Sequence, residues 1–462
     1  MRVIFLLSCT ALLSFAQLPS SNNADMIWSA GTIVTGDPTL GIIQNGAIAI
    51  KDERIVGVGP RADIEGRFRA ATHLDQPTAI LAPGLVNTHT HAGMSLLRGV
   101  ANDLKLQDWL EKFIFPAEAK NVDREFVRWG TRLALTEMML SGTTTFTDMY
   151  YFEDTVAEET KAAGMRGVLG QTIIGFPAPD FKTPAEQLAG AEAFLKKYDR
   201  DPLITPAVAP HAIYTTPDET LQAARALADK YSKPLLIHVS ETKTEFDESK
   251  EKRKLTPVQA LYRMNVLSGW TVAAHTVWLE DEDIATLGTA LTGIAHNPSS
   301  NMMLASGVAP IPKLIARGLS VGLGTDGPAG SNNDFDMFEE MDLAAKLQKV
   351  STGDPTALTA QQAFAMATLE GARALRLGHL IGSLEAGKLA DIISIRTDEP
   401  RAVPMYDVYA QLVYALKGSD VTDVMVNGKM IVRNRASLTM NRAAILAKAA
   451  EYHDKIAASL GK

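Results

Sequence analysis

Two histidines spaced i and i+2 follow an apolar run early in the chain. Residues 78–81 form the run, and His89 and His91 end the segment. In a β-strand, residues two apart point to the same face, so both imidazoles can aim at one point, as two nitrogen ligands of one metal ion must. The pair alone is a weak indication, because strand histidines are more often surface groups or satisfied core groups.

Further ionisable side chains follow other apolar, strand-like runs, and they strengthen the metal hypothesis. They are His211, His238, Glu241, His275, His296 and Asp326. With His89 and His91, these positions hold six of the nine histidines of the chain. We expect the other three, His73, His379 and His453, to be surface residues without a role.

Three imidazoles and one carboxylate suit a divalent transition metal such as zinc, with iron(II) as the alternative. The residues that can supply them, leaving room for a water, are His89, His91, His238 and Asp326. Such an ion lowers the pKa of its water toward ~7 and makes hydroxide available at neutral pH. The only cysteine is Cys9, so we expect no cysteine-ligated zinc and no disulfide framework.

Hydrolysis also needs a proton carrier, and Glu241 stands three residues after His238. It could take a proton from the water and pass it to the leaving group. His275 could orient the hydroxide or stabilise developing charge, and Asp326 could act as both ligand and base. Taken singly, each residue could have a purely structural role, such as a buried histidine bonded to a backbone carbonyl or an aspartate in a turn. The recurrence of such groups at strand ends favours a catalytic site.

The chain has 462 residues, is 46% hydrophobic and carries a formal net charge of −8. These values describe a globular protein, and without a basic stripe we expect no nucleic-acid partner. Residues 243–254 mix charges of both signs and are expected to form a solvated helix or loop. The expected partner is a small-molecule substrate, and a homo-oligomer is left open.

The N-terminus has the form of a secretory signal peptide. Met1 and Arg2 precede a mostly apolar stretch, Val3 to Phe15, and small residues stand before a cut after Ala16. The stretch is too short for a permanent membrane span, so we expect no stable membrane insertion. The expected location is periplasmic or extracellular, or cytoplasmic if the leader is not functional.

Strand-like runs alternate with helical patterns over roughly 300 residues, which is typical of a (β/α)₈ barrel. The expected strands are 78–91, 143–149, 166–172, 204–210, 235–239, 272–275, 293–296 and 320–324. Helices are expected at 124–140, 217–231, 283–287 and 360–375. A doubly wound open sheet is the alternative, but it would gather its ligands at one switch point.

Short strands with turn signals flank this section at both ends of the chain. Asn427 and Gly428 between two apolar runs predict a hairpin. We expect a small β-sandwich built from both termini. The predicted organisation is a leader (1–16), an N-terminal β part (25–80), the barrel (81–380), a C-terminal β part (381–440) and a terminal helix (441–462).

From about residue 27 to residue 434 the chain resembles the amidohydrolase superfamily. The most specific matches are the segments 83–91, 238–242, 296–301 and 324–327. Within it, the chain is similar to the 5-methylthioadenosine/S-adenosylhomocysteine deaminases and their chlorohydrolase relatives. The resemblance implies one metal, since His211 stands where binuclear members often carry a modified lysine.

The same resemblance implies residues for substrate binding. Trp109 and Glu118 match a segment that touches the nucleoside in these deaminases, where the carboxylate pairs with ribose hydroxyls. His211 matches a substrate-contacting histidine, and Glu241 and Asp326 are expected to face the substrate as well. Residues 170–179 contain no arginine for a homocysteine carboxylate, so a neutral tail, or none, fits better than S-adenosylhomocysteine.

The expected function is that of a zinc-dependent hydrolytic deaminase of an adenosine-type nucleoside resembling 5-methylthioadenosine. Activated water would attack the amino-bearing ring carbon, Glu241 would shuttle the proton, and ammonia would leave. One alternative is another amidohydrolase reaction: dechlorination or deamination of a triazine, deamination of a free heteroaromatic base, or cyclic amide hydrolysis. A non-catalytic periplasmic binding protein is the other, although binding alone needs no Glu241 beside His238.

Overall fold

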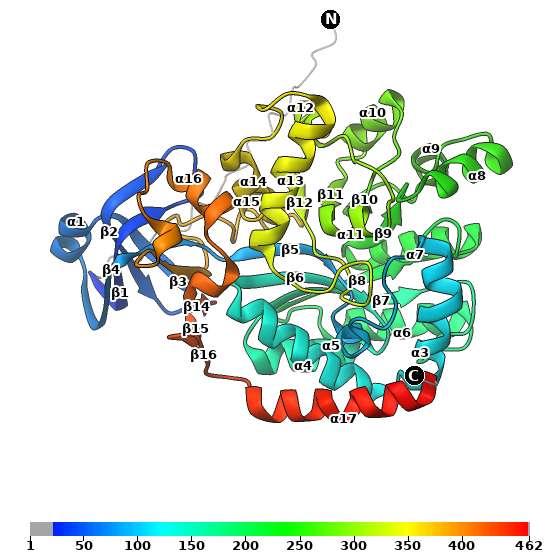
Figure 1. Cartoon of the computed structure of the whole chain (residues 1–462), viewed down its shortest axis with the longest axis horizontal. Helices are drawn as coiled ribbons and strands as arrows, with labels where there is room; N and C mark the ends of the chain where they lie inside the picture. Colours follow the sequence, from blue (N-terminus) through cyan, green and yellow to red (C-terminus); the bar gives the residue numbers. More distant parts are fainter. Residues whose placement is uncertain (1–21, 461–462) are drawn as a thin grey trace, which may run out of the picture.

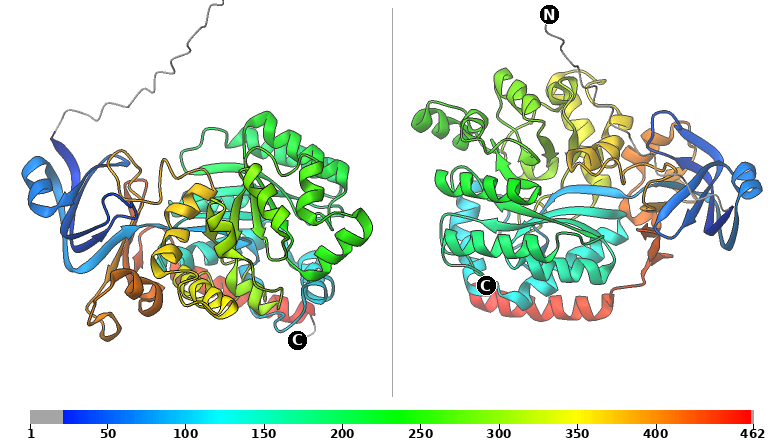
Figure 2. Two further views of the ribbon diagram at one scale, coloured as in Figure 1. Left: turned by 90° about the horizontal axis from the view of Figure 1, so that it is seen from above. Right: turned by 180° about the vertical axis from the view of Figure 1, so that it is seen from behind.

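The chain folds into a β/α barrel and a separate sheet, seen at the right and left of Figure 1, respectively. The computed structural model describes residues 22–460. Figure 2 shows from two further sides that the first and last strands lie together in the sheet, although most of the chain separates them. The predicted leader, 1–16, lies outside the described residues.

Eight parallel strands close the barrel, as the alternation of strand-like and helical patterns predicts. They are β5 (Leu85–Thr90), β6 (Thr143–Tyr150), β7 (Arg166–Ile173), β8 (Ile204–Pro210), β9 (Leu235–Val239), β10 (Thr271–His275), β11 (Gly293–His296) and β12 (Val321–Leu323). The closure runs from β12 back to β5, where Leu323 pairs with Asn87. The fold class is therefore confirmed, and the open sheet is not adopted.

Small and branched apolar side chains fill the barrel below the strand ends. They include Val86, Met149, Val168, Ala207, Leu236, Val272 and Ala295. Because side chains alternate between the two faces of a strand, the other set packs outward against the helices. The barrel interior is thus a packed core, and polar side chains can gather only at the carboxyl ends of the strands.

Helices cover the outside of the barrel. They are α4 (Arg124–Leu140), α5 (Glu153–Ala163), α6 (Pro184–Lys197), α7 (Asp218–Tyr231), α8 (Lys243–Arg253), α9 (Pro257–Arg263), α10 (Asp281–Thr289), α11 (Pro298–Met303), α12 (Ile311–Ala316), α13 (Met337–Thr352), α14 (Ala360–Met366) and α15 (Leu369–Ala374). Helix α7 shows the local logic, since Leu221, Ala224 and Ala228 form its buried stripe. Helix α8 is the predicted solvated helix of mixed charge.

The predicted helix 360–375 is interrupted. Helix α14 ends before Ala367, and Thr368 leaves helical geometry with a φ of −133° before α15 begins. The buried hydroxyl of Thr368 instead donates to the carbonyl oxygen of Phe364 at 2.7 Å. The break allows the two short helices to contact different elements: α14 packs on α13, and α15 packs on β5, β11 and β12.

Strands from both ends of the chain form one continuous sheet of eight strands, in the order β16-β15-β14-β13-β4-β1-β2-β3. They are β1 (Asn23–Val34), β2 (Ile42–Lys51), β3 (Arg54–Pro60), β4 (Arg69–Pro83), β13 (Ile392–Arg396), β14 (Val421–Val426), β15 (Lys429–Arg433) and β16 (Ala436–Ser437), with α1 (Arg61–Arg67) after β3. Trp28 of β1 and Ile392 of β13 belong to the same core, so the predicted pairing of the two chain ends is confirmed.

The segment 78–91, predicted as one strand, is two strands in different sheets. Strand β4 ends at Pro83 and β5 begins at Leu85. A Cβ on the intervening Gly84 would lie 2.1 Å from Oγ1 of Thr144, so only glycine fits there. The predicted hairpin is present, with positive φ angles at Asn427 (52°) and Gly428 (75°).

A buried ion pair joins the barrel to the sheet. The guanidinium of Arg166, at the start of β7, donates to both carboxylate oxygens of Asp391, at 3.1 and 3.2 Å. Asp391 also accepts a 2.7 Å bond from the backbone N–H of Asn427 in the hairpin. These contacts fix the sheet to the amino-terminal end of the barrel strands.

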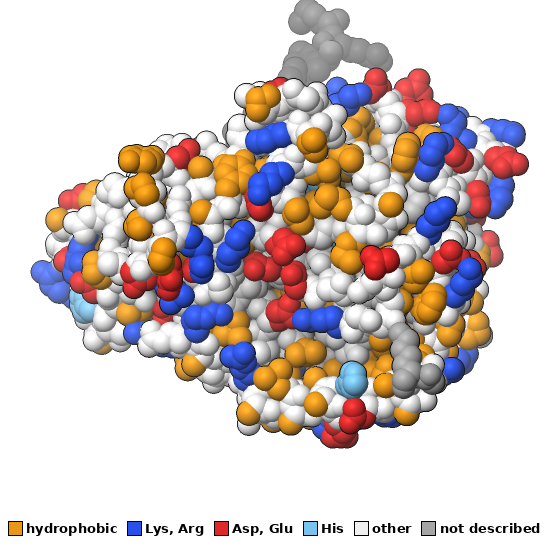
Figure 3. Space-filling model, in the orientation of Figure 1, with side chains coloured by type: hydrophobic (Ala, Val, Ile, Leu, Met, Phe, Trp, Pro, Cys, Tyr) orange, Lys and Arg blue, Asp and Glu red, His pale blue; other side chains and the backbone are white. Residues whose placement is uncertain are grey.

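The terminal helix α17 (Arg442–Leu460) runs along the barrel beside α3 (Phe115–Asn121) and α4, at the bottom of Figure 1. Its Ser459 accepts a bond from the Asn121 amide at 2.9 Å. Within residues 22–460 no helix is long and apolar enough to cross a membrane. On the face shown in Figure 3, acidic and basic side chains are interspersed with apolar ones.

Candidate active site

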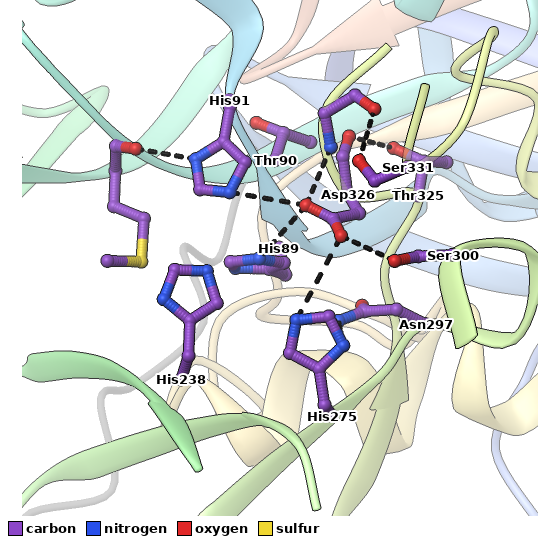
Figure 4. A network of polar contacts seen from close by, with 12 residues as sticks. His89, Thr90, His91, His238, His275, Asn297, Ser300, Thr325, Asp326 and Ser331 are labelled. Carbon is purple, nitrogen blue, oxygen red and sulfur yellow. Dashed lines mark hydrogen bonds and ion pairs between the residues drawn. The ribbon is translucent and has the colours of Figure 1, made fainter. Parts of the chain in front are cut away.

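His89 of β5, His91 directly after this strand and Asp326 after β12 meet at the carboxyl end of the barrel. Nε2 of His91 lies 3.2 Å from Oδ1 of Asp326, and Nε2 of His89 lies 3.4 Å from the same oxygen. Figure 4 shows both rings turned toward this carboxylate. The i, i+2 spacing places both rings on the same side of the chain. Strand β12 pairs with β5, and this pairing brings Asp326 beside the two rings.

His238 of β9 and His275 of β10 complete the cluster from the opposite wall (Figure 4). The ring centres of His89 and His238 are 4.9 Å apart, and those of His238 and His275 are 5.5 Å apart. Within each of two overlapping sets, His89–His91–Asp326 and His89–His238–His275, potential ligand atoms lie within 4.8 Å of one another. His89 belongs to both sets, so the four predicted ligands gather at this end of the barrel together with His275, although neither set contains all four of them.

Backbone carbonyls fix which ring nitrogen faces the centre. Nδ1 of His91 donates to the carbonyl oxygen of Met149 at 2.7 Å, and Nδ1 of His238 donates to that of His211 at 2.8 Å. A carbonyl oxygen can only accept, so each Nδ1 carries a proton, and Nε2 is the nitrogen that faces the centre. This orientation by a second partner is what metal-ligating histidines require.

The electrostatics of the cluster also fit a cation. Burial lowers the pKa of His89 to about 4, so its ring is neutral at physiological pH, and Nε2 of this ring is buried without a hydrogen-bond partner among the described residues. Burial opposes ionisation of Asp326, but the adjacent rings of His89 and His91 hold its pKa well below the usual value, and the carboxylate in turn raises the pKa of His91 to about 9. A divalent ion binds neutral imidazoles and a carboxylate, so an ion bound here would take the place of the proton that Asp326 favours on His91.

A second set of bonds holds Asp326 in place. Its Oδ2 accepts a 2.7 Å bond from the Ser300 hydroxyl, and its Oδ1 accepts a 2.7 Å bond from the backbone N–H of Gly327. Asp326 has a φ of 63°, a backbone conformation that is uncommon for residues other than glycine. His275 (71°) and Ser240 (52°) share this geometry, so backbone strain gathers at the site.

Glu241 lies beside His275 at the edge of the cluster. Its Oε2 is 3.9 Å from Nε2 of His275, and its side chain is buried, which raises its pKa. Glu245 supports it, because its two carboxylate oxygens accept the backbone N–H groups of Ser240 (3.0 Å) and Glu241 (2.8 Å). A buried carboxyl with an elevated pKa suits proton transfer near neutrality.

These groups form one wall of a pocket of about 590 Å³, a volume that includes space open to solvent. Its other walls carry Met94, Leu106, Trp109, Leu110, Ile114, Phe115, Glu118, Met149, Tyr150, Tyr151, Thr172, His211, Tyr214, Leu304 and Ser331. No lysine or arginine is among the described residues that line it. The aromatic and aliphatic walls suit a flat, largely apolar molecule, and the lining offers no cationic side chain to an anion.

The predicted substrate residues reach this pocket from one irregular helical segment and one strand end. Trp109 begins a π-helical turn (Trp109–Ile114) after α2 (Leu106–Asp108), and its indole N–H donates to the carbonyl oxygen of Ala329 at 2.9 Å. Glu118 follows on α3, where burial raises its pKa to about 7. His211 follows β8, and its Nδ1 lies 2.8 Å from the Thr215 hydroxyl oxygen.

The remaining histidines lie elsewhere. His73, His379 and His453 are exposed, as predicted. His296 is buried at the end of β11 but does not line the pocket, and among residues 22–460 neither of its ring nitrogens has a hydrogen-bond partner.

Sequence reasoning missed several supporting residues. Tyr150 and Tyr151 end β6 and face Glu118, yet tyrosine after an apolar run usually means core packing. Ser300 and Asn301 bond Asp326 and His275 from α11, but serine and asparagine near a helix start are typical caps. Two signals were available for Ser300 and Asn301: they follow a predicted strand, and they lie in the segment 296–301 that carries the family resemblance.

Comparisons with known proteins agree with this geometry. A family model described as the amidohydrolase family matches residues 80–431. The chain is 43% identical over 438 residues to 5-methylthioadenosine/S-adenosylhomocysteine deaminase 1 of Syntrophus aciditrophicus (strain SB), covering 95% of this chain and 99% of the relative. It is 42% identical over 409 residues to the 5'-deoxyadenosine deaminase of Methanothermobacter thermautotrophicus, covering 87% and 93%.

Solved structures share the fold. An adenosine deaminase from Xanthomonas campestris, crystallised with bound zinc, matches with a TM-score of 0.92 at 39% identity over 94% of this chain and 99% of that one. An atrazine chlorohydrolase from Arthrobacter aurescens TC1 shares the fold, with a TM-score of 0.85 at 23% identity over 93% and 100%. The chain belongs to the amidohydrolase family of metal-dependent hydrolases and is an enzyme that cleaves carbon–nitrogen bonds other than peptide bonds.

Proposed function

We propose that the protein is a zinc-dependent hydrolytic deaminase of adenosine-type nucleosides, with 5-methylthioadenosine as the type of substrate. The observation that carries the proposal is a single pocket that contains both the histidine–aspartate cluster and the buried carboxylate of Glu118. The first could hold a metal beside the reacting ring carbon, and the second could bind ribose hydroxyls at the other end. Both nucleoside deaminase relatives and the zinc-containing neighbour support the proposal.

His89, His91, His238 and Asp326 would hold the ion. When bound, such an ion lowers the pKa of a water molecule and so makes a nucleophile available at neutral pH. Glu241 accepts a proton from the attacking water and delivers it toward the departing amine. The oxygen bonds to the ring carbon, the carbon–nitrogen bond breaks, and ammonia leaves with the transferred protons.

His275 faces both carboxylates involved in proton transfer. Its Nε2 lies 3.9 Å from Oε2 of Glu241 and 3.9 Å from Oδ2 of Asp326. Asn301 fixes the ring, since its Oδ1 lies 3.0 Å from Nδ1. The ring is therefore placed to stabilise negative charge that develops between the two acids, and we assign His275, Glu241 and Asp326 the catalytic roles.

The pocket favours a neutral 5'-substituent on the ribose. Phe115, which lines it, packs edge-to-face on Phe176 in the loop after β7, with ring centres 5.1 Å apart. Lys182, farther along this loop, donates to the carbonyl oxygens of Ala178 (2.7 Å) and Pro179 (3.3 Å). Its ammonium is thus held by the backbone and does not line the pocket, so it offers no partner for a substrate carboxylate there. We therefore expect methylthio or unsubstituted 5'-carbons to be preferred over the charged homocysteine tail of S-adenosylhomocysteine.

Ammonia release tests the function. Purified protein with one equivalent of zinc is incubated with 5-methylthioadenosine, 5'-deoxyadenosine, adenosine, S-adenosylhomocysteine, free adenine and a chlorotriazine. We expect release from the neutral nucleosides, with Glu118→Gln raising their KM, while Glu111→Gln on the exposed side of the same segment leaves KM unchanged. Turnover of the triazine or free base alone would contradict the proposal.

We also propose that the protein is exported, since residues 1–16 have the form of a cleavable leader. The test is N-terminal sequencing of the protein from cell fractions. A mature N-terminus at Gln17 in the periplasmic or extracellular fraction is expected, whereas an intact Met1 in the cytoplasm would contradict export.

A further inference from the structure

The carboxyl end of β6 contacts the metal-binding strand through two consecutive residues. Oδ1 of Asp148 accepts the Thr90 hydroxyl and the backbone N–H of Ala92, both at 2.5 Å. The next carbonyl, that of Met149, accepts Nδ1 of His91 at 2.7 Å. The end of β6 therefore bonds the His91 ring and also the residues directly before and after it, Thr90 and Ala92.

The following two residues turn to the substrate side of the pocket. The hydroxyl of Tyr150 donates to Oε1 of Glu118 at 2.7 Å, and Tyr151 faces the same carboxylate and favours its ionised form. All three side chains are buried, with exposed fractions of 4% (Glu118), 4% (Tyr150) and 6% (Tyr151). Four consecutive residues of one strand end thus contact both the metal-binding and the substrate-binding side of the site.

We propose that Tyr150 and Tyr151 are positioning residues that keep Glu118 an acceptor-only carboxylate for two adjacent substrate hydroxyls. The inference rests on the proposed nucleoside function. An ionised carboxylate offers about four lone-pair sites, of which the Tyr150 phenol occupies one and the Tyr151 phenol faces another. The sites that remain can accept both hydroxyls of a cis-diol, whereas a protonated carboxyl would present a donor in place of one acceptor.

The tyrosines can act only as donors to this group. Burial and the neighbouring Glu118 charge raise the pKa of both phenols well above the usual value, so they stay protonated. Burial in turn raises the pKa of Glu118 to about 7, and the two phenol bonds oppose that rise. Losing a phenol should therefore protonate Glu118 over a wider range of pH and weaken diol binding.

Few other ionisable groups face this carboxylate. His91, at the end of β5, acts on it by charge and favours its ionised form. Helix α17, which packs on α3, contacts Asn121 and Lys120 through Ser459. The two phenols are thus the neutral donors that act directly on Glu118.

Tyr150→Phe separates the hydroxyl from the packing of the ring. The ring lies against Gly93, where a Cβ would approach Tyr150 Cδ1 to 2.5 Å, and phenylalanine preserves that contact. Tyr151→Phe is the second variant, should the first fold poorly. Tyr262→Phe, on the exposed face of α9, is the control.

Kinetics are measured for each variant with adenosine and 2'-deoxyadenosine between about pH 6 and 9, beside metal content and circular dichroism. Because a hydrogen bond to a charged group is lost, we expect the adenosine KM of Tyr150→Phe to rise about tenfold or more near pH 7, with kcat within about twofold. The KM for 2'-deoxyadenosine, which lacks the diol, should change less. The acid limb of kcat/KM for adenosine should move to higher pH.

Equal rises in KM for the two nucleosides, a fall in kcat at unchanged KM, or wild-type kinetics in both variants would overturn the inference. The same assay separates this result from failure of the proposed function. If the wild-type protein deaminates neither nucleoside, the function fails and the inference falls with it. If it deaminates adenosine and the phenylalanine variants match it, the function stands and the role of the tyrosines is wrong.

Discussion

The hydroxyl of Ser300 donates a 2.7 Å hydrogen bond to Oδ2 of Asp326, while Oδ1 of the same carboxylate faces the two histidines at the end of β5. Both residues are buried. The aspartate is therefore oriented by helix α11 on one side and by β5 on the other. Its geometry depends on a residue that is neither a predicted ligand nor part of the pocket lining.

Replacing Ser300 with alanine should lower kcat/KM by about tenfold to a hundredfold, because a hydrogen bond to a buried charged group contributes about 1.5–3 kcal/mol. Metal content should stay near that of the wild type, since the histidines are untouched. Ser249→Ala on α8, outside the pocket, is the control, as its hydroxyl donates instead to the Leu255 carbonyl oxygen. Steady-state kinetics and metal analysis check the prediction, and equal activity of both variants would contradict it.

Removing the metal should abolish activity and lower the melting temperature. The cluster brings the Asp326 charge beside several buried rings, and an ion that binds only the folded state stabilises it. Dialysis against a chelator followed by zinc titration, with activity and thermal melting read in parallel, tests this. Full activity in protein shown to be metal-free would rule out the metal-dependent mechanism.

Glu241→Gln should lower kcat by about 10²–10⁴-fold, the usual contribution of a positioned acid–base group. The amide keeps the shape but cannot accept the proton. Zinc content and substrate KM should change little, because Glu241 is not among the predicted metal ligands. Glu251→Gln on exposed α8 is the matched control, and a KM effect without a kcat effect would assign Glu241 to binding alone.

Breaking the ion pair between barrel and sheet should destabilise the protein without changing its chemistry. Arg166→Ala leaves Asp391 buried and partly unpaired, which costs about 3–5 kcal/mol. The melting temperature should fall clearly, while kcat at low temperature stays near wild type. Arg200→Ala, whose side chain is almost fully exposed beside Asp199, should leave melting unchanged.

Glu340 should make stability depend on pH. It is buried, and its oxygens accept Ser299 N–H (3.2 Å) and the Asn332 amide (3.0 Å). Burial raises its pKa from 4.5 to about 8, so the folded protein holds a proton that the unfolded chain releases above pH 4.5. This contribution to the free energy of unfolding is complete below that pH and declines, by about 1.4 kcal/mol per pH unit, until about pH 8.

Urea unfolding at about pH 5, 6.5 and 8 measures this decline, and the slope in Glu340→Gln should be shallower by about one proton. The comparison uses slopes, because the amide also changes the hydrogen bonds at every pH. Glu219→Gln, exposed at the start of α7, serves as the control. Parallel slopes in wild type and Glu340→Gln would show that the carboxyl stays ionised.

Local patterns predicted the barrel and the convergence of its ionisable groups well. The apolar runs marked the strands, and parallel strands in a closed barrel necessarily bring their carboxyl ends together, so His89, His238 and Asp326 had to meet. The hairpin at Asn427 was equally local, because its turn chemistry lies in two adjacent residues.

Features that depend on distant partners could not be predicted. His275 and Asp326 have positive φ angles, and because neither residue is a glycine, the sequence does not indicate this backbone conformation. Tyr150 donates a hydrogen bond to Glu118, which lies 32 residues earlier in the chain. Without knowledge of that partner, the sequence indicates only an aromatic core residue. The boundary at Gly84 was visible in the sequence, but the apolar residues on both sides hid the change of sheet.

The arrangement of the terminal sheet has a consequence for how the protein is made. Strand β4 is central in the sheet, and its partner β13 is synthesised only after the whole barrel. Until Ile392–Arg396 emerge from the ribosome, the backbone of Ala79–Pro83 is an uncovered apolar edge, the kind that promotes aggregation. Biogenesis of this enzyme thus includes an aggregation-prone interval that ends only when the segment from residue 392 of 462 onward is made.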